Sequence, residues 1–332
     1  MKRFRARVAS RGLTRRLGGG PRVISYTAAN AVVSILAGKG TLDYIDATGI
    51  LAGFRYPSGV LQLSDGNILV CDAGNNRIRI VTPEGVVTTL AGSTQGLLDG
   101  TGAAANFYYP QEACVMPSDG KIIVSDRFNN RLRLVTYPGG VVTTFAAGGG
   151  FNSPIGVAVI PSTGHFVVGD AGNNVVKHVT YPGGVVTTLA SGFSDLQGVA
   201  VLPNGNIVVS EYTGNRIKLV TTSTYAANSG VVTTLAGSGT GQFADGTGAA
   251  ASFYTPVGLA VLPNGNILVA DRSTGRLRMI TSSTYAANSG VVTTLLNLSG
   301  GGGGLDGVGV LSNGNIVIGG TFTQRIHILS FT

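Results

Sequence analysis

Hydrophobic and polar residues alternate in short runs along most of the chain, and turns rich in Gly, Asn and Pro separate the runs. One unit begins with an alternating run at 257–262, followed by a Pro-Asn-Gly-Asn turn and an apolar run at 267–271. Asn and Gly tolerate the positive φ that a tight hairpin turn requires. Two further runs, 276–280 and 290–295, complete the unit. This pattern predicts four short antiparallel strands.

The same unit recurs along the sequence. Each copy has a glycine at the centre of its first hairpin turn, and these are Gly66, Gly120, Gly164, Gly205, Gly265 and Gly314. A single four-stranded sheet leaves an apolar face uncovered, so units of this kind stack radially around a channel. The sequence therefore predicts an all-β fold, a six-bladed β-propeller.

The two ends of the repeat region complement each other. The sixth unit ends at Thr332 without a fourth strand, while residues 31–38 match the fourth-strand segment 230–237. We expect the N-terminal strand to complete the last blade, because this would cover two open strand edges. The expected organisation is a basic N-terminal arm at 1–24 and a propeller at 25–332.

The repeated pattern Pro-x-Gly-Val-Ala-Val-Leu-Pro-Asn-Gly-Asn-Ile-x-Val-x-Asp, with Arg-Ile shortly after it, resembles the NHL repeat. It appears at 154–170, 197–216 and 256–276, and the segment 245–256 resembles the connectors of that family. The resemblance spans residues 31–332. It implies a six-bladed propeller but not one activity, because NHL propellers serve as protein scaffolds, RNA binders, sensor ectodomains and lyases.

Charge is distributed unevenly along the 332 residues, which carry a formal net charge of +8. Residues 1–22 hold eight basic residues and no acid, so the remainder has 15 basic and 15 acidic groups and is neutral. The sequence has no apolar run long enough for a membrane-spanning helix, so no membrane partner is expected. The arm also lacks the apolar core of a secretory signal.

Three interpretations of the basic arm stay open. Its composition fits a mitochondrial or plastid transit peptide. It also fits a nucleic-acid-binding arm at 1–22, or an assembly arm that contacts neighbouring subunits in a virion or another large complex. In the last two cases the contacts would come from the arginines of the arm, chiefly Arg3, Arg5, Arg7, Arg15 and Arg16.

Charged residues recur at fixed places in the repeat. The second strand of five units ends in a carboxylate, and these are Asp72, Asp126, Asp170, Glu211 and Asp271. Five residues later most units have an arginine, which we expect to pair with the carboxylate across the turn. Seven residues later come Arg79, Arg133, Lys177, Lys218, Arg278 and His327. This second row is expected at solvated strand edges, with a patterned positive band as the alternative.

One unit breaks the repeat at the start of the first strand. Five units have glycine there and the second has Glu112, while Gln111, Gln197 and Asp306 stand at the preceding position in their own units. These four residues are predicted to converge near the axis. Six-bladed lactonases, which this fold resembles, hold a divalent cation there. That likeness makes Glu112 and Asp306 candidates for Ca²⁺ or another divalent cation, but two carboxylates are an incomplete ligand set. We therefore expect no cofactor.

Two kinds of loop also repeat. Three connectors, at 46–57, 99–110 and 245–256, share the pattern Asp-x-Thr-Gly-x-x-Ala-x-Phe-x-x-Pro. Their Asp is predicted to cap a helical turn, and their Phe to fill the space between blades. Near-identical insertions place Tyr225 and Tyr285 in two loops of adjacent units, which we expect to be exposed and to form a partner surface.

The sequence favours binding over catalysis. The repeat places His165, His178 and His327 away from the channel-lining strands, which disfavours a His-liganded zinc site. No Ser/His/Asp set or phosphate-binding loop stands out. The predicted function is a non-enzymatic scaffold for protein–protein interaction or structural assembly, with protein partners in a larger complex. The alternatives are a lactonase-type hydrolase with a cation at the channel mouth, and an RNA-binding NHL module.

Overall fold

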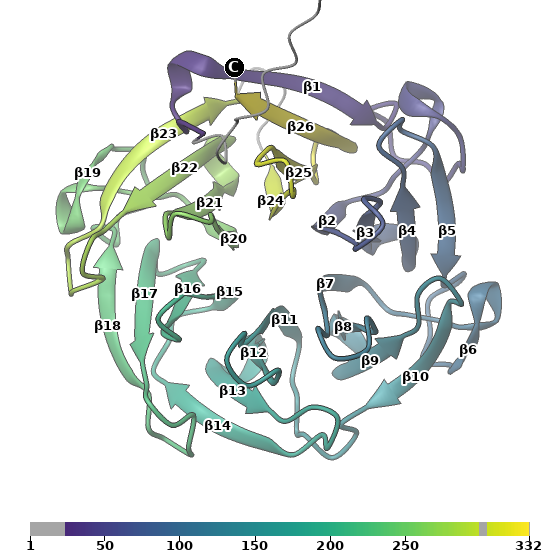
Figure 1. Ribbon diagram of the computed structural model, residues 1–332, viewed down its shortest axis with the longest axis horizontal. Coiled ribbons are helices and arrows are strands. Elements are labelled where there is room, and N and C mark those ends of the chain that lie inside the picture. Colours follow the sequence, from purple (N-terminus) through teal and green to yellow (C-terminus); the bar gives the residue numbers. More distant parts are fainter. Residues whose placement is uncertain (1–23, 299–303, 332) are drawn as a thin grey trace, which may run out of the picture.

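Six antiparallel sheets form a closed ring around a central channel (Figure 1). The computed structural model describes residues 24–298 and 304–331, so the arginines predicted to act in the arm lie outside the described residues. In five sheets the four main strands follow one another in chain order from the axis to the rim, and in the sixth sheet the outermost strand is the N-terminal one. The predicted all-β, six-bladed propeller is confirmed.

Each blade has four main strands. Blade 1 consists of β2 (Pro57–Gln62), β3 (Ile68–Asp72), β4 (Arg77–Val81) and β5 (Val87–Ala91). Blade 2 consists of β7 (Pro110–Val115), β8 (Ile122–Asp126), β9 (Arg131–Val135) and β10 (Val141–Phe145). Blade 3 consists of β11 (Pro154–Val159), β12 (Phe166–Asp170), β13 (Val175–Val179) and β14 (Val186–Ser191).

The second half of the ring repeats this plan. Blade 4 consists of β15 (Leu196–Val201), β16 (Ile207–Glu211), β17 (Arg216–Thr221) and β18 (Val231–Ala236). Blade 5 consists of β20 (Pro256–Val261), β21 (Ile267–Asp271), β22 (Arg276–Thr281) and β23 (Val291–Asn297). Blade 6 consists of β24 (Leu305–Val310), β25 (Ile316–Gly320), β26 (Arg325–Phe331) and β1 (Ala31–Ala37). Two short strands, β6 (Gly100–Thr101) and β19 (Gly246–Thr247), widen blades 2 and 5 at the rim.

Short 3-10 turns link these strands. Between the second and third strands lie η3 (Ala73–Asn75), η5 (Arg127–Asn129), η6 (Ala171–Asn173) and η8 (Arg272–Thr274). The three long connectors contain η2 (Gly49–Leu51), η4 (Gly102–Ala104) and η7 (Gly248–Ala250), and η1 (Ala28–Asn30) precedes β1. The first-hairpin turns have their glycine at positive φ, for example 85° at Gly265, as the sequence predicts.

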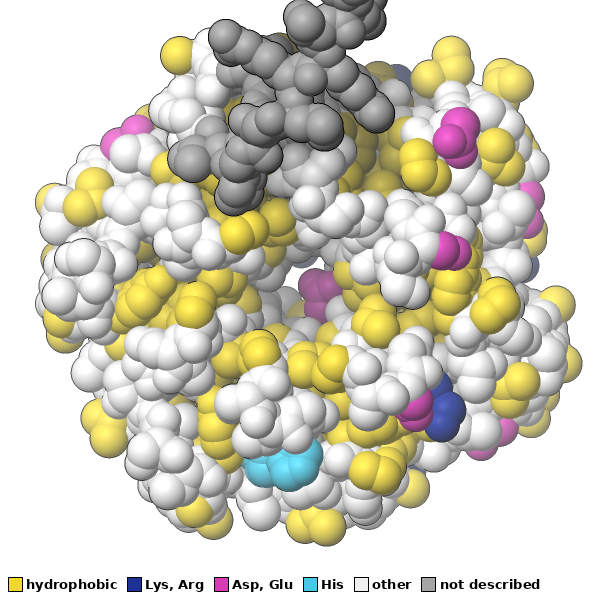
Figure 2. Space-filling view, viewed as in Figure 1, with side chains coloured by type: hydrophobic (Ala, Val, Ile, Leu, Met, Phe, Trp, Pro, Cys, Tyr) yellow, Lys and Arg dark blue, Asp and Glu magenta, His cyan; other side chains and the backbone are white. Residues whose placement is uncertain are grey.

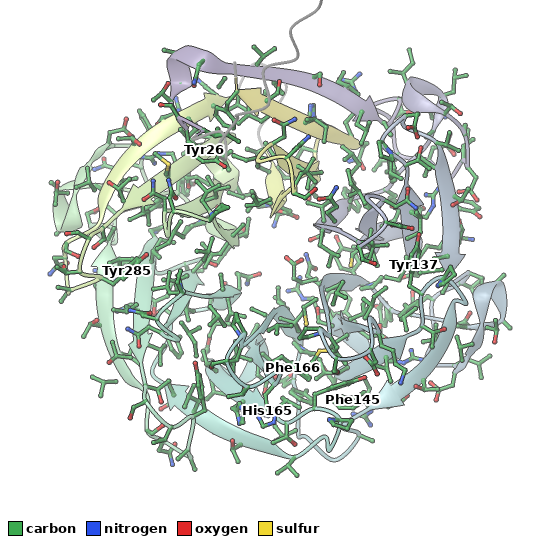
Figure 3. The ribbon with its side chains drawn as sticks, in the orientation of Figure 1. Tyr26, Tyr137, Phe145, His165, Phe166 and Tyr285 are labelled. Atoms are coloured by element: carbon green, nitrogen blue, oxygen red, sulfur yellow. The ribbon has the colours of Figure 1, made fainter. Side chains whose placement is uncertain are left out.

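The ends of the chain close the ring as expected. Strand β1 pairs antiparallel with β26, and Val32 lies opposite Ser330. Just before β1, the ring of Tyr26 packs edge-on against Phe331 with 4.9 Å between the ring centroids, over blade 6 (Figure 3). The N-terminal strand therefore supplies the edge that the last unit lacks.

The apolar core lies between the blades. Alternating strand residues from adjacent sheets interdigitate, and the connector residues Phe54, Phe107 and Phe253 are fully buried among them, as predicted. Cys71 and Cys114 are free thiols within the same layers. A buried aromatic ring removes a large apolar surface from water, so these connectors stabilise the packing of neighbouring blades.

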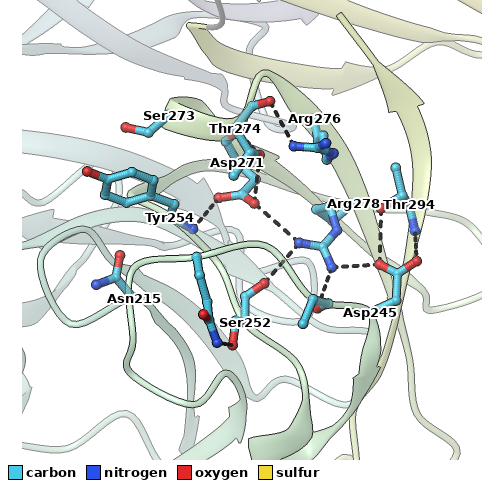
Figure 4. A network of polar contacts seen from close by, with 12 residues as sticks. Asn215, Asp245, Ser252, Tyr254, Asp271, Ser273, Thr274, Arg276, Arg278 and Thr294 are labelled. Atoms are coloured by element: carbon cyan, nitrogen blue, oxygen red, sulfur yellow. Dashed lines mark hydrogen bonds and ion pairs between the residues drawn. The ribbon is translucent and has the colours of Figure 1, made fainter. Parts of the chain in front are cut away.

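A buried arginine ties each long connector to its blade. In blade 5 the guanidinium of Arg278 contacts Asp271 at 3.2 Å and Asp245 at 2.7 Å (Figure 4). It also donates to the carbonyl oxygens of Ser252 and Ala244 in the connector. The other oxygen of Asp271 accepts the backbone N–H of Tyr254. One guanidinium thus holds a strand end and a connector together.

The same arrangement occurs in blades 1 and 2, and it corrects one sequence-based expectation. The side chains of Arg79, Arg133 and Arg278 are fully buried, so the second basic row is neither a solvated strand edge nor a positive band. It is the residue seven positions after the carboxylate, not five, that forms the ion pair. The nearer Arg77 instead lies 3.6 Å from the ring centroid of Tyr44.

The connector aspartates also differ from expectation. Asp245 does not cap η7, whose first residue follows Thr247 without a side-chain cap. It pairs with Arg278 and accepts two hydrogen bonds from the backbone and side chain of Thr294. The reason is electrostatic, because a buried guanidinium needs a second carboxylate or carbonyl more than a single 3-10 turn needs a cap. Asp46 and Asp99 occupy the same place in blades 1 and 2.

We predict that replacing Arg278 by Met lowers the free energy of unfolding by about 3–5 kcal/mol, because Asp271 would keep an uncompensated charge in a fully buried position. The measurement is urea unfolding followed by circular dichroism. Arg276→Met is the matched control, since its half-buried guanidinium stacks on Phe243 and should contribute about 1 kcal/mol or less. Equal losses in the two variants would contradict the role given to Arg278.

Candidate functional site

The first strands of the six blades line the channel, and glycines let them come close together. A Cβ atom added to Gly258 would lie 2.0 Å from the carbonyl oxygen of Asp306 in the next blade. One added to Gly307 would lie 2.1 Å from the carbonyl oxygen of Ser58. These contacts are shorter than any side chain tolerates, so glycine is required at this position by the close approach of neighbouring strands.

Blade 2 departs from this rule with Glu112. Its carboxyl reaches toward blade 1, where a Cβ on Gly59 would lie 2.5 Å from Oε1 of Glu112. The backbone N–H of Ala113 donates to the same oxygen at 3.3 Å. Burial of the carboxyl, together with the negative charge of Asp306, raises the pKa of Glu112 to about 8. Glu112 is therefore mostly uncharged at neutral pH.

Gln111, Glu112, Gln197 and Asp306 come together in the structure. They line one cavity of about 240 Å³ inside the channel. Tyr109, Arg127, Phe128, Ile155, Val257 and Arg272 complete most of its wall. Figure 2 shows the opening of the channel, with an acidic side chain on its wall.

The polar groups of the wall are mostly held by neighbours. One oxygen of Asp306 lies 3.1 Å from Nε of Arg272, and the other accepts a hydrogen bond from Thr321. Gln197 donates to Asp195 at 2.8 Å. Gln111 donates its amide N–H to Ser58, but its buried Oε1 has no hydrogen-bond partner.

These contacts test whether the cavity suits a divalent cation. Asp306 already pairs with a guanidinium, and the described wall of the cavity has one further carboxylate, Glu112. Within residues 24–298 and 304–331, no three His, Cys, Asp or Glu side chains are grouped so that they could hold a metal ion. The donor set therefore does not fit Ca²⁺, which takes six to eight oxygen ligands.

Two arginines of the wall were not among the residues expected from the sequence. Arg127 and Arg272 occupy the same repeat position, directly after the carboxylate of the second strand, in blades 2 and 5. These blades lie opposite each other across the channel (Figure 1). The other four blades carry smaller or uncharged residues there, namely Ala73, Ala171, Tyr212 and Thr321. This departure is visible in the aligned repeats, just as Glu112 is.

The tyrosine loops do not have the expected exposure. Tyr225 and Tyr285 are half-buried, and their hydroxyls donate to the carbonyl oxygens of Gly205 and Gly265 at 2.6 and 2.7 Å. Figure 3 shows Tyr285 beside blade 5. Each ring therefore ties a rim loop to the first hairpin turn of its own blade. The predicted partner surface lacks its two aromatic side chains.

None of the three histidines lines the axial cavity, as the repeat pattern indicates. His165 and His178 contact each other at 3.2 Å in blade 3. His327 lies beside Thr323 in blade 6, and burial lowers its pKa to about 4.

A second departure lies on the rim, where blade 6 meets blade 1. Ile50 and Leu51 of η2 have 65% and 69% of their surface exposed, although the other two long connectors have alanines there. Ile35 of the neighbouring strand β1 is exposed where other blades have Thr, and Val86 pairs with the connector residue Thr48. We call Ile35, Ile50, Leu51 and Val86 the rim patch. Figure 2 shows hydrophobic side chains projecting from the rim at this place, on the upper right.

Comparisons with known proteins agree with this architecture. The family model described as NHL repeat matches residues 54–81 and 253–278. With the six-bladed ring, these matches confirm the resemblance seen in the sequence: the propeller carries NHL repeats at these two places. No curated protein matches the chain in sequence. Among the described residues, no helix is long and apolar enough to cross a membrane.

Several solved structures share the fold. An auxiliary nutrient binding protein from Bacteroides thetaiotaomicron has a TM-score of 0.72 at 14% identity, covering 91% of this chain and 76% of that chain. A gluconolactonase from Xanthomonas campestris has a TM-score of 0.63 at 15% identity, over 96% and 99% of the two chains. A virginiamycin B lyase from Staphylococcus aureus has a TM-score of 0.57 at 15% identity, over 91% and 100%. At these identities the likeness shows the fold alone.

We predict that Gly258→Ala lowers the free energy of unfolding by about 1–3 kcal/mol, because the added methyl group forces β20 and β24 apart. Thermal unfolding measured by calorimetry tests this. Gly148→Ala is the control, since a Cβ there meets no atom within 4 Å. If both variants unfold at the wild-type temperature, the close approach of the inner strands does not require glycine.

Proposed function

We propose that this propeller is a non-enzymatic scaffold that binds a protein partner through the rim patch. The observation that supports this is the exposure of Ile50 and Leu51 at a place where the equivalent connectors carry alanine. Exposed apolar side chains that gather on one part of a protein surface are typical of an interaction site. Burying an Ile or Leu side chain contributes roughly 1.5–3 kcal/mol, so a partner that covers the patch gains substantial binding energy.

The rim patch is also built to stay in place. The backbone N–H of Gly49 donates a hydrogen bond to the carbonyl oxygen of Gly85. The backbone N–H of Gly38 donates a hydrogen bond to the carbonyl oxygen of Gly49. These bonds join η2 to the turn that precedes β5 and to the residue that follows β1. A rigid apolar surface loses little conformational entropy on binding, which favours affinity.

The arm at 1–22 is the second part of the proposal. Its eight basic residues against no acid suit contacts with neighbouring subunits of an assembly. Binding of nucleic acid by the arm is the alternative for this segment, and it would make affinity fall steeply with salt concentration.

The described residues give less support to the two other functions expected from the sequence. A lactonase-type hydrolase would need a cation at the channel mouth, and Asp306 and Glu112 do not fit one. An RNA-binding face would need exposed basic rows, whereas Arg79, Arg133 and Arg278 are buried. The structural neighbours include both binding proteins and enzymes, so the fold does not choose between these functions.

We predict that Ile50→Ala/Leu51→Ala, which restores the residues of the other connectors, abolishes patch-dependent association and leaves the unfolding temperature unchanged. The tagged protein is expressed in its native source, and co-purifying proteins are compared by quantitative mass spectrometry. Val185→Thr is the control, because Val185 is 59% exposed on the rim of blade 3.

A protein that is retained by the wild type and by Val185→Thr, but not by the double variant, supports the proposal. The same proteins in all three samples would contradict it. Light scattering of the purified chain covers a further outcome. A dimer that dissociates in the double variant would mean that the patch binds a second copy and not a different protein.

A further inference from the structure

Two guanidinium groups in the axial cavity have nitrogen atoms without hydrogen-bond partners among the described residues. Among the described residues, Arg127 makes no ion pair, and none of its guanidinium nitrogens has a hydrogen-bond partner there; its close neighbour is the ring of Phe128 at 4.9 Å. Arg272 pairs with Asp306 through Nε, and its terminal nitrogens have no partner among the same residues. By contrast, the terminal nitrogens of the fully buried Arg133 make four hydrogen bonds.

Arg127 is partly removed from water and lies within the electrostatic influence of a second guanidinium, that of Arg272. Desolvation is the main cause that lowers the pKa of Arg127, and the positive charge of Arg272 lowers it further. At neutral pH the two guanidiniums face the carboxylate of Asp306, and Asp195, which also acts on Arg127, lies beside Gln197, while Glu112 is mostly protonated. A single negative charge placed between the two arginines would offset both the desolvation and the repulsion.

The remaining wall limits the shape of the ligand. Ile155 and Val257 are apolar, and the volume of about 240 Å³ is below the usual range for a drug-sized ligand. The buried Oε1 of Gln111 has no hydrogen-bond partner, so it would accept a hydroxyl of the ligand. The protonated Glu112 carboxyl supplies a donor where an ionised one would repel the ligand.

From this arrangement we infer that the axial cavity binds a small hydroxycarboxylic acid, with its carboxylate held between Arg127 and Arg272 and a hydroxyl bound to Gln111. Guanidinium groups bind planar carboxylates with two parallel hydrogen bonds, which favours this group. A phosphate carries more than one negative charge at neutral pH, so the carboxylate of Asp306 disfavours it more than it disfavours a carboxylate ligand. This site is separate from the rim patch, so its test does not depend on the proposed protein partner.

The first experiment is isothermal titration calorimetry with the full chain and a panel of small acids. Lactate, glycerate and gluconate test the hydroxycarboxylate, and acetate tests the carboxylate alone. Lactamide, which has the hydroxyl but no charge, and inorganic phosphate are the comparison ligands. We expect at least one hydroxycarboxylate to bind more tightly than acetate, and lactamide and phosphate to show no binding.

Arg127→Ala is the decisive variant. Alanine occurs naturally at the same repeat position in blades 1 and 3, so the propeller is expected to fold, and unfolding curves verify this. Loss of a charge-assisted hydrogen-bonding pair should weaken binding by about tenfold or more. Arg55→Ala is the control, because Arg55 is exposed and does not line the cavity. Arg272 is not used, since its removal would leave Asp306 unpaired.

The pH dependence of affinity gives an independent readout. The charged or titratable groups that act on Glu112 or feel its charge are Asp306, Cys71 and Cys114. Burial raises the pKa of both thiols, so they stay neutral at pH 9. Ionisation of Glu112 above pH 8 therefore adds a repelling charge, and binding should be about tenfold weaker at pH 9 than at pH 7. In Glu112→Gln the affinity should not change over this interval.

Two results would overturn the assigned site. One is the absence of measurable binding of every carboxylate at millimolar concentration, with the protein folded. The other is equal affinity of the wild type and Arg127→Ala, which would place the ligand elsewhere. Tighter binding of phosphate than of any carboxylate would likewise reject the assigned ligand class.

Discussion

The paired carboxylate and arginine inside each long-connector blade determine where both proposed binding surfaces lie. In blade 1, Arg79 joins the strand-end Asp72 to Asp46 of the connector. The connector held in this way carries Phe54, which fills the space between blades, and η2, which bears the rim patch. On the other side of the pair, the strand-end carboxylate is followed directly by the turn that faces the channel. In blades 2 and 5 that turn begins with Arg127 and Arg272.

This interaction fixes geometry more than it adds stability. Burial is the largest influence on Asp72 and Asp271 and raises the pKa of each to about 6, even though a guanidinium contacts each carboxylate. The desolvation of the two charges therefore offsets much of their attraction. The pair fixes the position of the connector, because a guanidinium that contacts two carboxylates and two carbonyl oxygens can adopt only one orientation. A connector attached in this way holds exposed apolar residues without rearranging to bury them.

The repeat determines the ring, its closure and the position of the aromatic connector residues, so these follow from the sequence. Burial of Arg79, Arg133 and Arg278 does not follow from composition, because arginine is rarely buried unless it is paired. The signal lies in a correlation between distant positions. Arginine occurs in this row only in the units with an Asp-x-Thr-Gly connector, and Lys177, Lys218 and His327 occur in the others. The partial burial of Tyr225 and Tyr285 does not follow from the sequence. Each hydroxyl donates to the first hairpin turn of its own blade, and no local pattern indicates this contact.

Regular repeats make departures informative, because the other blades show which residues the fold accepts at each position. A different residue in one blade is therefore not required by the fold. Ile50 and Leu51 replace alanines without gaining any packing inside the protein, and Arg127 replaces alanine without gaining an ion pair. Both changes cost the isolated chain free energy, by exposing apolar surface in the first case and by desolvating a charge in the second. Such costs are offset only by something that covers the surface or enters the cavity. The two departures lie at the rim and on the axis, so the two proposed binding surfaces are independent of each other.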